Sequence, residues 1–381
     1  MSNWRVTVHI PDGYLSPQTC VVGFAVAVPV MATAAARVHK RVKTRNVPTL
    51  AMLAAVCFLI MMFNVPIPDG TTAHAVGGAL VAILLGPWAA VIAVSVALAF
   101  QALLFGDGGV LAYGVNVFNM AIVLPFVSYG IYRLISGNVN LTSPRRAVAG
   151  FIGGYIGLNA AALCCGIELG FQPTLFHDAS GAPLYSPYHL SQSVPAMLLA
   201  HLTVAGIAEG IITAAVVTYL QRANLPLLAV NHPGVPVDAE APAEEGSRRR
   251  RLLRPTVVAG AVMALLVVLT PLGLLAPGGA FGEDAPQDLD LKKLGLSTVP
   301  EGLNKYNGIW HNAIFSGYDF AGDEHPTLGY IVSAVVGIVV IGLVVFAVTK
   351  LIMMRANRNS STPSSSADSA EPSGTSGRVR S

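Results

Sequence analysis

Eight long stretches of this chain contain no Asp, Glu, Lys or Arg, and they limit its possible folds more than any other feature. The stretches cover Gly13–Ala36, Asn46–Pro68, Gly70–Gly106, Gly108–Tyr132, Ala147–Ile167, Ala179–Ala208, Pro255–Gly282 and Pro326–Thr349. About 20 mostly apolar residues are enough for a helix to cross a bilayer. Charged residues make up only 11% of the chain, whereas about 25% is usual in soluble domains. We therefore expect an all-α membrane protein.

Two of the stretches do not correspond to single transmembrane helices. Gly70–Gly106 is too long for one span, and Pro87 inside it ends a helix and favours a turn. The stretch Ala179–Ala208 begins in a loop, and its helix is expected from about Ser193 to about Leu220. The sequence therefore predicts about nine transmembrane helices, a bundle of seven followed by two more.

The basic residues gather on one side of the predicted membrane. They follow the first, fifth, seventh and ninth spans: Arg37, Lys40, Arg41, Lys43, Arg45, Arg133, Arg145, Arg146, Arg222, Arg248, Arg249, Arg250, Arg251, Arg254, Lys350, Arg355 and Arg358. The intervening loops 65–72, 106–110 and 168–192 contain no Lys or Arg. Because loops rich in Lys and Arg stay in the cytoplasm, we expect the N-terminus outside and the C-terminus inside.

The chain divides into two predicted membrane units. Residues 1–221 form the first, and residues 222–254 form a cytoplasmic linker that ends in a run of arginines. Residues 255–358 form the second, with two spans on either side of an extracellular loop. Residues 359–381 are rich in Ser and are expected to be disordered.

Several classes of function lack their usual motifs in this chain. It has no Gly-Lys pair and so no GxxxxGK[ST] loop for ATP phosphates, which means that ATP-driven work would need another subunit. Neither GxSxG nor HExxH is present, which argues against an enzyme. The net charge of +3 is too small to indicate nucleic-acid binding. All four cysteines lie in apolar stretches, so no disulfide framework is expected.

Two histidines stand beside the same turn sequence. His9 is followed directly by an Ile-Pro-Asp-Gly segment that contains Asp12, and His74 comes shortly after a second one that contains Asp69. Both turns lie on the predicted outer face, where the two imidazoles can converge. Imidazole nitrogens suit Ni, Co, Cu and Zn, although the spacing alone also fits two structural histidines.

A second pair of ionisable residues lies inside a predicted span. His201 and Glu209 are about two turns apart on one helix face. An ionisable residue within a membrane helix is a candidate for function. The spacing leaves two interpretations open. The two residues support a ligand site, or they form a buried polar pair that fixes helix packing.

These motifs together resemble those of CbiM and NikM, the substrate-capturing membrane components of energy-coupling-factor transporters for cobalt and nickel. The resemblance covers residues 8–221 and rests on HIPDGYLSP from His9, NVPIPDGTTAHAVGGAL from Asn64, Gly86-Pro87-Trp88 and HLTVAGIAEG from His201. The rest of the chain is similar to the small NikN-type partner. Its segment Val299-Pro300-Glu301-Gly302-Leu303 resembles the Pro-Asp-Gly-Leu-Glu motif of that partner.

The resemblance implies a metal held by four nitrogens. They are an N-terminal amine and a backbone amide nitrogen, from Val8 and His9, and the imidazoles of His9 and His74. An amine, the next amide nitrogen and a His side chain form fused rings in one plane, which suits Ni(II) or Co(II) as a transported substrate better than tetrahedral Zn(II). Four further residues are candidates for supporting the site: Asp12, Asp69, His201 and Glu209. Because the amine belongs to the residue before the histidine, we expect the functional chain to begin at Val8.

The resemblance also implies a location and partners. We expect a multi-pass protein of a bacterial or archaeal cell membrane, surrounded by lipid, that works with a transmembrane coupling subunit and cytoplasmic ATPase subunits. No organic cofactor is expected. Because a linker separates the two units, the second is expected to be dispensable for metal binding but needed for uptake. The alternative is a stand-alone secondary carrier or channel for divalent transition-metal cations, and nickel is not distinguished from cobalt.

Overall fold

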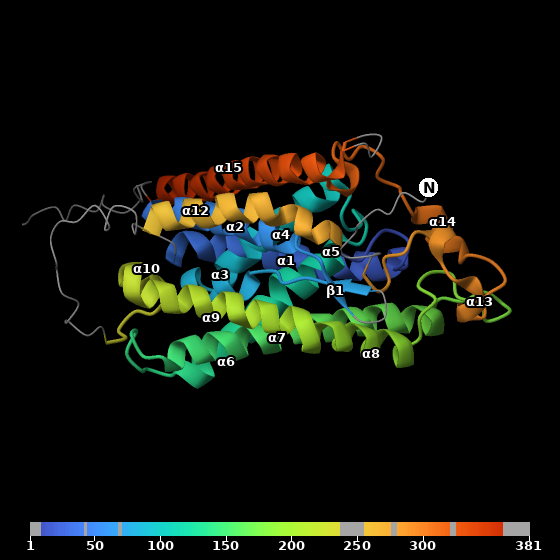
Figure 1. The fold of residues 1–381 in the computed structure, drawn as a ribbon, viewed down its shortest axis with the longest axis horizontal. Coiled ribbons are helices and arrows are strands. Elements are labelled where there is room, and N and C mark those ends of the chain that lie inside the picture. Colours follow the sequence, from blue (N-terminus) through green and yellow to red (C-terminus); the bar gives the residue numbers. More distant parts are fainter. Residues whose placement is uncertain are drawn as a thin grey trace, which may run out of the picture.

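A computed structural model of the chain describes residues 9–41, 44–67, 71–236, 255–275, 280–320 and 325–360. The predicted ligand Val8, the candidate Asp69, most of the predicted linker and nearly all of the predicted disordered tail lie outside these ranges. Within them, the chain forms an elongated bundle whose long helices run roughly side by side (Figure 1).

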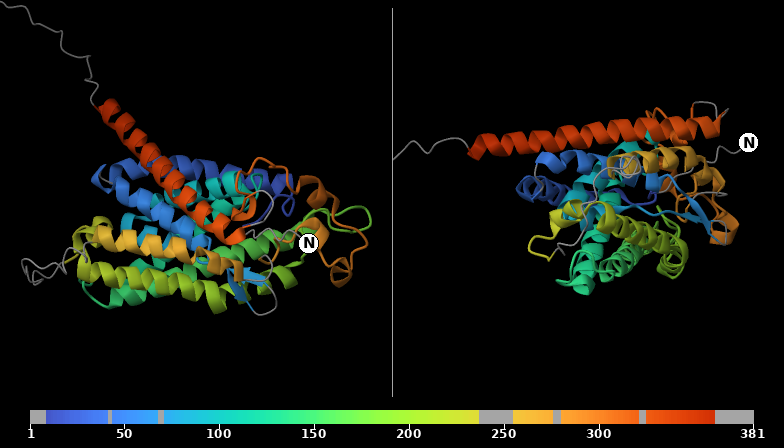
Figure 2. Two further views of the ribbon diagram at one scale, coloured as in Figure 1. Left: turned by 45° about the horizontal axis from the view of Figure 1, so that its top comes forward. Right: turned by 60° about the vertical axis from the view of Figure 1, so that its left-hand side comes forward.

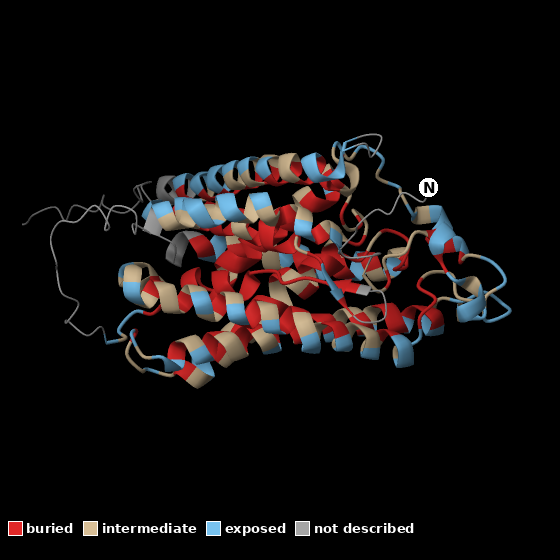
Figure 3. Ribbon diagram, in the orientation of Figure 1, coloured by how far each residue is buried: buried red, intermediate tan, exposed pale blue. Residues whose placement is uncertain are grey.

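Eight helices of the described ranges are long and apolar enough to cross a membrane, in agreement with the predicted all-α membrane fold. They are formed by α1 (Pro17–Arg41), α2 (Val47–Met61), α4 (Pro87–Phe100) with the π-helix Gln101–Phe105, α5 (Tyr113–Asn116) with the π-helix Val117–Val123 and α6 (Leu124–Ser136), α7 (Arg145–Leu175), α8 (Leu190–Ala200) with the π-helix His201–Ala205 and α9 (Gly206–Ala223), α12 (Pro255–Leu269) and α15 (Pro326–Ser360). The outward sides of the bundle are exposed (Figure 3) and carry apolar side chains such as Val21, Leu265 and Leu343. Such a surface fits a lipid environment.

The predicted third span is shorter than a membrane helix, so the described count is eight rather than nine. Helix α3 (Gly78–Leu85) has eight residues, all of them buried. At 1.5 Å per residue it is about 12 Å long, less than half the thickness of the hydrocarbon core. The predicted break is present, because Gly86 adopts a φ of 94° and Pro87 begins α4. Helix α3 is therefore a buried half-helix in the middle of the bundle.

A short β-hairpin precedes α3 and was not predicted. Strand β1 (Val65–Ile67) pairs antiparallel with β2 (Thr71–Ala73), with Val65 opposite Ala73. The hairpin ends immediately before His74, so its backbone pairing helps to set the position of that residue. It lies near the end of the bundle that also holds the N-terminal segment (Figure 1).

Glycines allow α7 to approach its neighbours closely. A Cβ atom added to Gly153 would lie 2.7 Å from the carbonyl oxygen of Ser128, and one added to Gly157 would lie 2.8 Å from that of Leu124. Both partners belong to α6. Small residues at helix interfaces permit such contacts in membrane bundles, and they bring α7 to the wall of the cavity described below.

The second unit packs against the first along the bundle. Helix α15 lies across α2, where Gly337 is so close to the ring of Phe58 that no side chain would fit between them. The segment between α12 and α15 covers the end of the bundle (Figure 2) and contains α13 (Leu291–Leu294), α14 (Glu301–Tyr306) and the short 3₁₀ helix Ser316–Tyr318. The peptide N–H of Gly302 donates to the carbonyl of Leu184 at 2.7 Å. The two predicted units are thus in direct contact.

Candidate metal site

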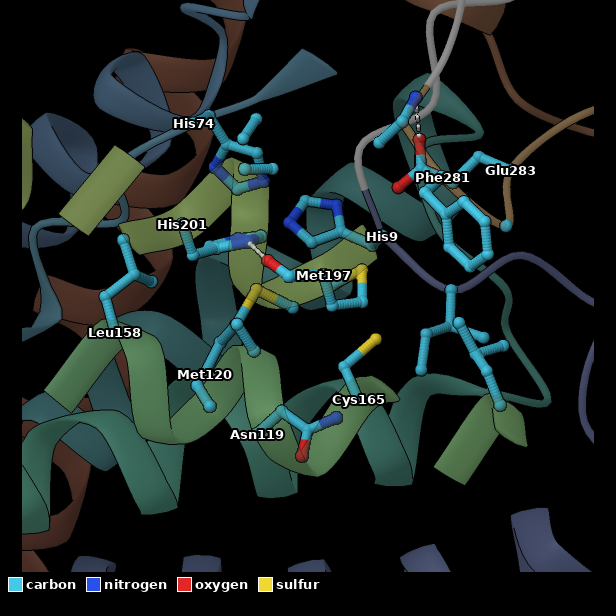
Figure 4. Close-up of a pocket in the computed structure, with 18 of the residues that line it drawn as sticks. His9, His74, Asn119, Met120, Leu158, Cys165, Met197, His201, Phe281 and Glu283 are labelled. Atoms are coloured by element: carbon cyan, nitrogen blue, oxygen red, sulfur yellow. Dashed lines mark hydrogen bonds between the residues drawn. The ribbon is translucent and has the colours of Figure 1, made fainter. Parts of the chain in front are cut away.

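His9, His74 and His201 line one small cavity, which has a volume of about 70 Å³ (Figure 4). This volume exceeds what a single water molecule needs, so the cavity has room for an ion. The remaining wall includes three sulfur-containing side chains, Met120, Cys165 and Met197. The predicted convergence of His9 and His74 is therefore present, with His201 beside them.

His9 is buried, with 3% of its surface exposed, and is held on one side by a carboxylate. Its Nδ1 lies 3.1 Å from Oδ1 of Asp107. Its Nε2 has no hydrogen-bond partner among the described residues. The following peptide is clamped by Asn116, whose side chain accepts from the N–H of Ile10 at 3.2 Å and donates to the carbonyl of Ile10 at 3.0 Å. A buried nitrogen without a partner is costly and marks a place where a ligand can bind.

His74 faces His9 edge to face, with ring centroids 5.3 Å apart. Its Nδ1 lies 2.9 Å from the carbonyl oxygen of Ala75. Because a carbonyl only accepts, Nδ1 carries the proton and Nε2 of the neutral ring carries the lone pair that a metal needs. The contact with Ala75 thus fixes the tautomer of a candidate metal ligand, as neighbouring groups commonly do for histidine ligands.

Glu209 supports the backbone that carries His74. Its carboxylate accepts hydrogen bonds from the N–H groups of Val76 at 2.8 Å, Gly77 at 2.7 Å and Ala79 at 3.1 Å. These groups lie at the N-terminus of α3, where a negative charge is favourable. Glu209 is fully buried, and these three amides provide hydrogen-bond partners for both of its carboxylate oxygens.

His201 and Glu209 have separate roles in the structure. His201 lines the cavity, and its Nδ1 lies 2.7 Å from the carbonyl oxygen of Met197. No side-chain hydrogen bond joins it to Glu209 in the described part of the chain. Of the two interpretations left open by the sequence, a mutual polar pair is not formed, and both residues lie beside the candidate site.

Asp12 anchors the N-terminal turn on the loop that carries Asp107. Its carboxylate accepts from the N–H groups of Val110 at 3.0 Å, Leu111 at 2.8 Å and Ala112 at 3.2 Å. Burial raises the pKa of this carboxyl, although the three peptide donors oppose that effect. Asp12 thus acts on the shape of the turn through the backbone.

Two important residues were missed from the sequence, Asp107 and Tyr318. The other carboxylate oxygen of Asp107, Oδ2, accepts from the Tyr318 hydroxyl at 2.5 Å and from Nε2 of Gln101 at 3.3 Å. Asp107 had a recognisable signal, because it is an acidic residue between two uncharged stretches in a loop without Lys or Arg. Tyr318 had none, since only the tertiary fold brings it to this loop.

The described side chains do not form a complete metal site by themselves. No group of three or more His, Cys, Asp or Glu side chains among the described residues is arranged to hold a metal ion. The four cysteines are free thiols, as predicted from their apolar surroundings. Nitrogen ligands beyond the imidazoles would have to come from the backbone and from the segment before His9.

Comparison with known proteins identifies two matching regions. Residues 9–227 match the CbiM family, described as a cobalt uptake substrate-specific transmembrane region. Residues 254–354 match the PDGLE domain. Both matches agree with the resemblance found in the sequence motifs.

Two relatives match nearly the whole chain. The fused nickel transport protein NikMN of Rhodobacter capsulatus is 44% identical, over 88% of this chain and 95% of that protein. The probable fused nickel transport protein LarMN of Lactiplantibacillus plantarum is 45% identical, over 89% of this chain and 96% of that protein. A crystal structure described as a truncated transition metal transporter is 58% identical and covers 56% of this chain and 98% of its own, with a TM-score of 0.53.

Proposed function

Because the chain belongs to the CbiM family of cobalt-uptake transmembrane proteins and carries a PDGLE domain behind it, we propose that it is the substrate-binding membrane component of an ATP-driven energy-coupling-factor importer for Ni(II) or Co(II). The observation that carries the proposal is the pair of buried imidazoles of His9 and His74, which face each other across one small cavity. Two buried histidines that share a cavity are suited to a transition-metal cation.

The proposed ligands are the nitrogens of Val8 and His9 and the imidazoles of His9 and His74. In the structure, Nδ1 of His9 contacts Asp107. A small chelate ring that contains the amide nitrogen of His9 can be closed only by Nδ1 of the same residue. Nε2 lies on the far side of the imidazole and cannot close it. Binding of a metal through Nδ1 would therefore replace the contact between that nitrogen and Asp107.

Nickel is the preferred substrate in this proposal. The two relatives that match nearly the whole chain are both described as nickel transport proteins, whereas the family description names cobalt. A planar set of four nitrogens is the geometry that Ni(II) adopts readily. It also disfavours Zn(II), which prefers a tetrahedral set.

ATP hydrolysis is assigned to partner subunits, because the chain has no Gly-Lys pair and hence no phosphate loop of the GxxxxGK[ST] type.

The alternative, a stand-alone carrier, would need ionisable coupling groups inside the membrane. Of the two such groups named from the sequence, His201 and Glu209, the carboxylate of Glu209 accepts from three peptide N–H groups of α3. The proposed orientation places the end of the bundle with His9 outside the cell, in line with the distribution of Lys and Arg.

The proposal is tested by equilibrium binding of Ni(II) and Co(II) to the purified full chain, followed by uptake into vesicles that contain this chain alone. It predicts tight binding that is lost in His9→Ala and retained in His177→Ala. His177 is a matched control because it lies in an exposed loop and does not line the cavity. Vesicles with this chain alone should not accumulate metal, and uptake driven by an ion gradient would establish the carrier instead.

A further inference from the structure

Glu168 is a partly buried carboxylate of α7 that lies beside the wall of the cavity. We infer that Glu168 compensates the charge of the cation in that cavity, without being one of its ligands. This inference rests on the proposed function and adds to it a residue that none of the sequence motifs includes. It follows from the position of Glu168 on α7, from its hydrogen bond and from the charges around it.

One face of α7 forms the part of the cavity wall next to Glu168. Leu158, Ala161, Cys165 and Leu169 line the cavity, and they follow one another at intervals of three or four residues. Residues at this spacing lie on one side of a helix. Glu168 comes three residues after Cys165 and directly before Leu169. Its side chain therefore lies at the edge of the face that lines the cavity.

Asn119 connects the carboxylate of Glu168 to the cavity. Its Nδ2 donates to Oε2 of Glu168 at 2.6 Å. Asn119 belongs to the π-helix Val117–Val123, is 3% exposed and lines the cavity (Figure 4). The negative charge of Glu168 is thus held about one side chain away from the place of the ion.

Glu168 differs from other carboxylates near the site in what it binds. Asp12 and Glu209 each accept from three peptide N–H groups. The carboxylate of Glu168 accepts from one neutral amide, and no basic side chain of the described ranges forms an ion pair with it. Residues 106–132 and 147–221, which include both helices that meet at Glu168, contain no Lys or Arg. No cation of the protein therefore balances this charge among the described residues.

A cation in the cavity would balance it. An ionisable group within a membrane helix is costly unless it is paired. A carboxylate and a divalent cation about 10 Å apart, in a medium of dielectric constant about 20, attract each other by more than the energy of about a tenfold change in affinity. Asp107, which contacts His9, and Glu283, which lines the cavity, add to the same negative potential. Neutralising Glu168 alone should therefore weaken metal binding and not abolish it.

Glu168→Gln in the full chain tests the inference, because it removes the charge and keeps both the size of the side chain and an oxygen that can accept from Asn119. Equilibrium titration should show that it binds Ni(II) about tenfold more weakly or worse. Glu168→Asp retains the charge and should bind more tightly than Glu168→Gln. The control is Asp288→Asn, which removes a unit charge from an exposed position of the second unit and should bind as the wild type does.

Melting temperatures without metal separate charge compensation from a structural role. A carboxylate without a cationic partner contributes little to folding, so Glu168→Gln should melt at the wild-type temperature or above it. Weaker Ni(II) binding together with a lower melting temperature would indicate a structural role and overturn the inference. Wild-type affinity in Glu168→Gln would overturn it as well.

A second variant decides the matter if Glu168→Gln does not fold. Asn119→Leu removes the donor that holds the carboxylate beside the cavity, so it should weaken Ni(II) binding. Asn159→Leu is its matched control. Asn159 is also a buried amide whose Oδ1 has no partner among the described residues, but it donates to the carbonyl of Tyr155 on its own helix and does not line the cavity.

Wild-type Ni(II) affinity in Asn119→Leu would then overturn the inference, and so would equal losses in Asn119→Leu and Asn159→Leu. Failure of the wild-type chain to bind either Ni(II) or Co(II) would instead refute the proposed function on which the inference rests.

Discussion

The imidazoles of His9 and His74 meet edge to face at 5.3 Å, although one precedes the first long helix and the other follows the second. The orientation of each imidazole is determined by a different neighbouring group. Asp107 contacts Nδ1 of His9 at 3.1 Å, and the carbonyl of Ala75 lies 2.9 Å from Nδ1 of His74. Both rings are thus held by neighbouring groups in this structure.

We predict that His74→Ala lowers Ni(II) affinity by more than about 100-fold, beyond the range of supporting residues. The fold should persist, because the substitution removes a polar ring from the wall of a cavity and leaves the α3 cap by Glu209 intact. Isothermal titration of the purified variant measures the affinity, and its melting temperature without metal measures the fold. Unchanged Ni(II) affinity in His74→Ala would show that His74 is not a ligand. His177→Ala is the control, because His177 lies outside the cavity.

Glu209→Gln should destabilise the protein through α3. A neutral amide keeps one acceptor oxygen, and its NH₂ group would face a peptide N–H at the other position. We expect a loss of about 2 kcal/mol in the free energy of unfolding, as for a hydrogen bond to a charged group. Thermal melts in detergent without metal check the loss. The spectrum of bound Ni(II) should stay as in the wild type, because Glu209 is not a ligand; a changed spectrum would contradict its role as a helix cap.

His232 should make the stability of the metal-free protein depend on pH. It lies beyond α9, where burial lowers its pKa to about 4, assisted by Arg146 and Arg133 and opposed by the bond to the Leu228 carbonyl. The unfolded chain takes up this proton near the usual value of 6.5, whereas the folded chain resists protonation down to about pH 4. The contribution of His232 to the free energy of unfolding should therefore be fully present above pH 6.5. It should be lost as the pH falls from 6.5 to about 4, by about 3 kcal/mol at most.

Melting temperatures of wild type and His232→Gln across this pH range test that dependence. Glutamine has no proton to gain, so the variant should show a flatter profile between pH 6.5 and 4 than the wild type. Parallel profiles for the two proteins would contradict the assignment to His232. The measurement is made without metal so that protonation of metal ligands does not contribute.

Local sequence patterns were sufficient to predict most of the fold and the proximity of His9 and His74. Uncharged stretches located the long helices, and the repeated Ile-Pro-Asp-Gly segments pointed to His9 and His74. The length of α3 was not predictable in this way, because a buried half-helix and a full span have the same apolar composition. The hairpin at Val65–Ile67 was also hidden, since Pro66 within it disfavours a strand.

The remaining contacts of the candidate site join distant parts of the chain. Asp107 gains its role only where the N-terminal segment packs on its loop, and Tyr318 reaches it only from the second unit. Glu209 was found as an ionisable residue in a span, but its function as a cap became clear only once α3 was known to be short. Hydrophobic patterning carries no information on such pairings.

X-ray absorption spectroscopy of the full chain loaded with Ni(II) tests the central claim most directly. The cavity wall offers two kinds of ligand, the imidazoles of His9 and His74 and the sulfur atoms of Met120, Cys165 and Met197. The account predicts a planar shell of nitrogen donors that includes two imidazoles, and the disappearance of that shell in His74→Ala. A shell that contains sulfur, or an octahedral shell of water and carboxylate oxygens, would contradict it.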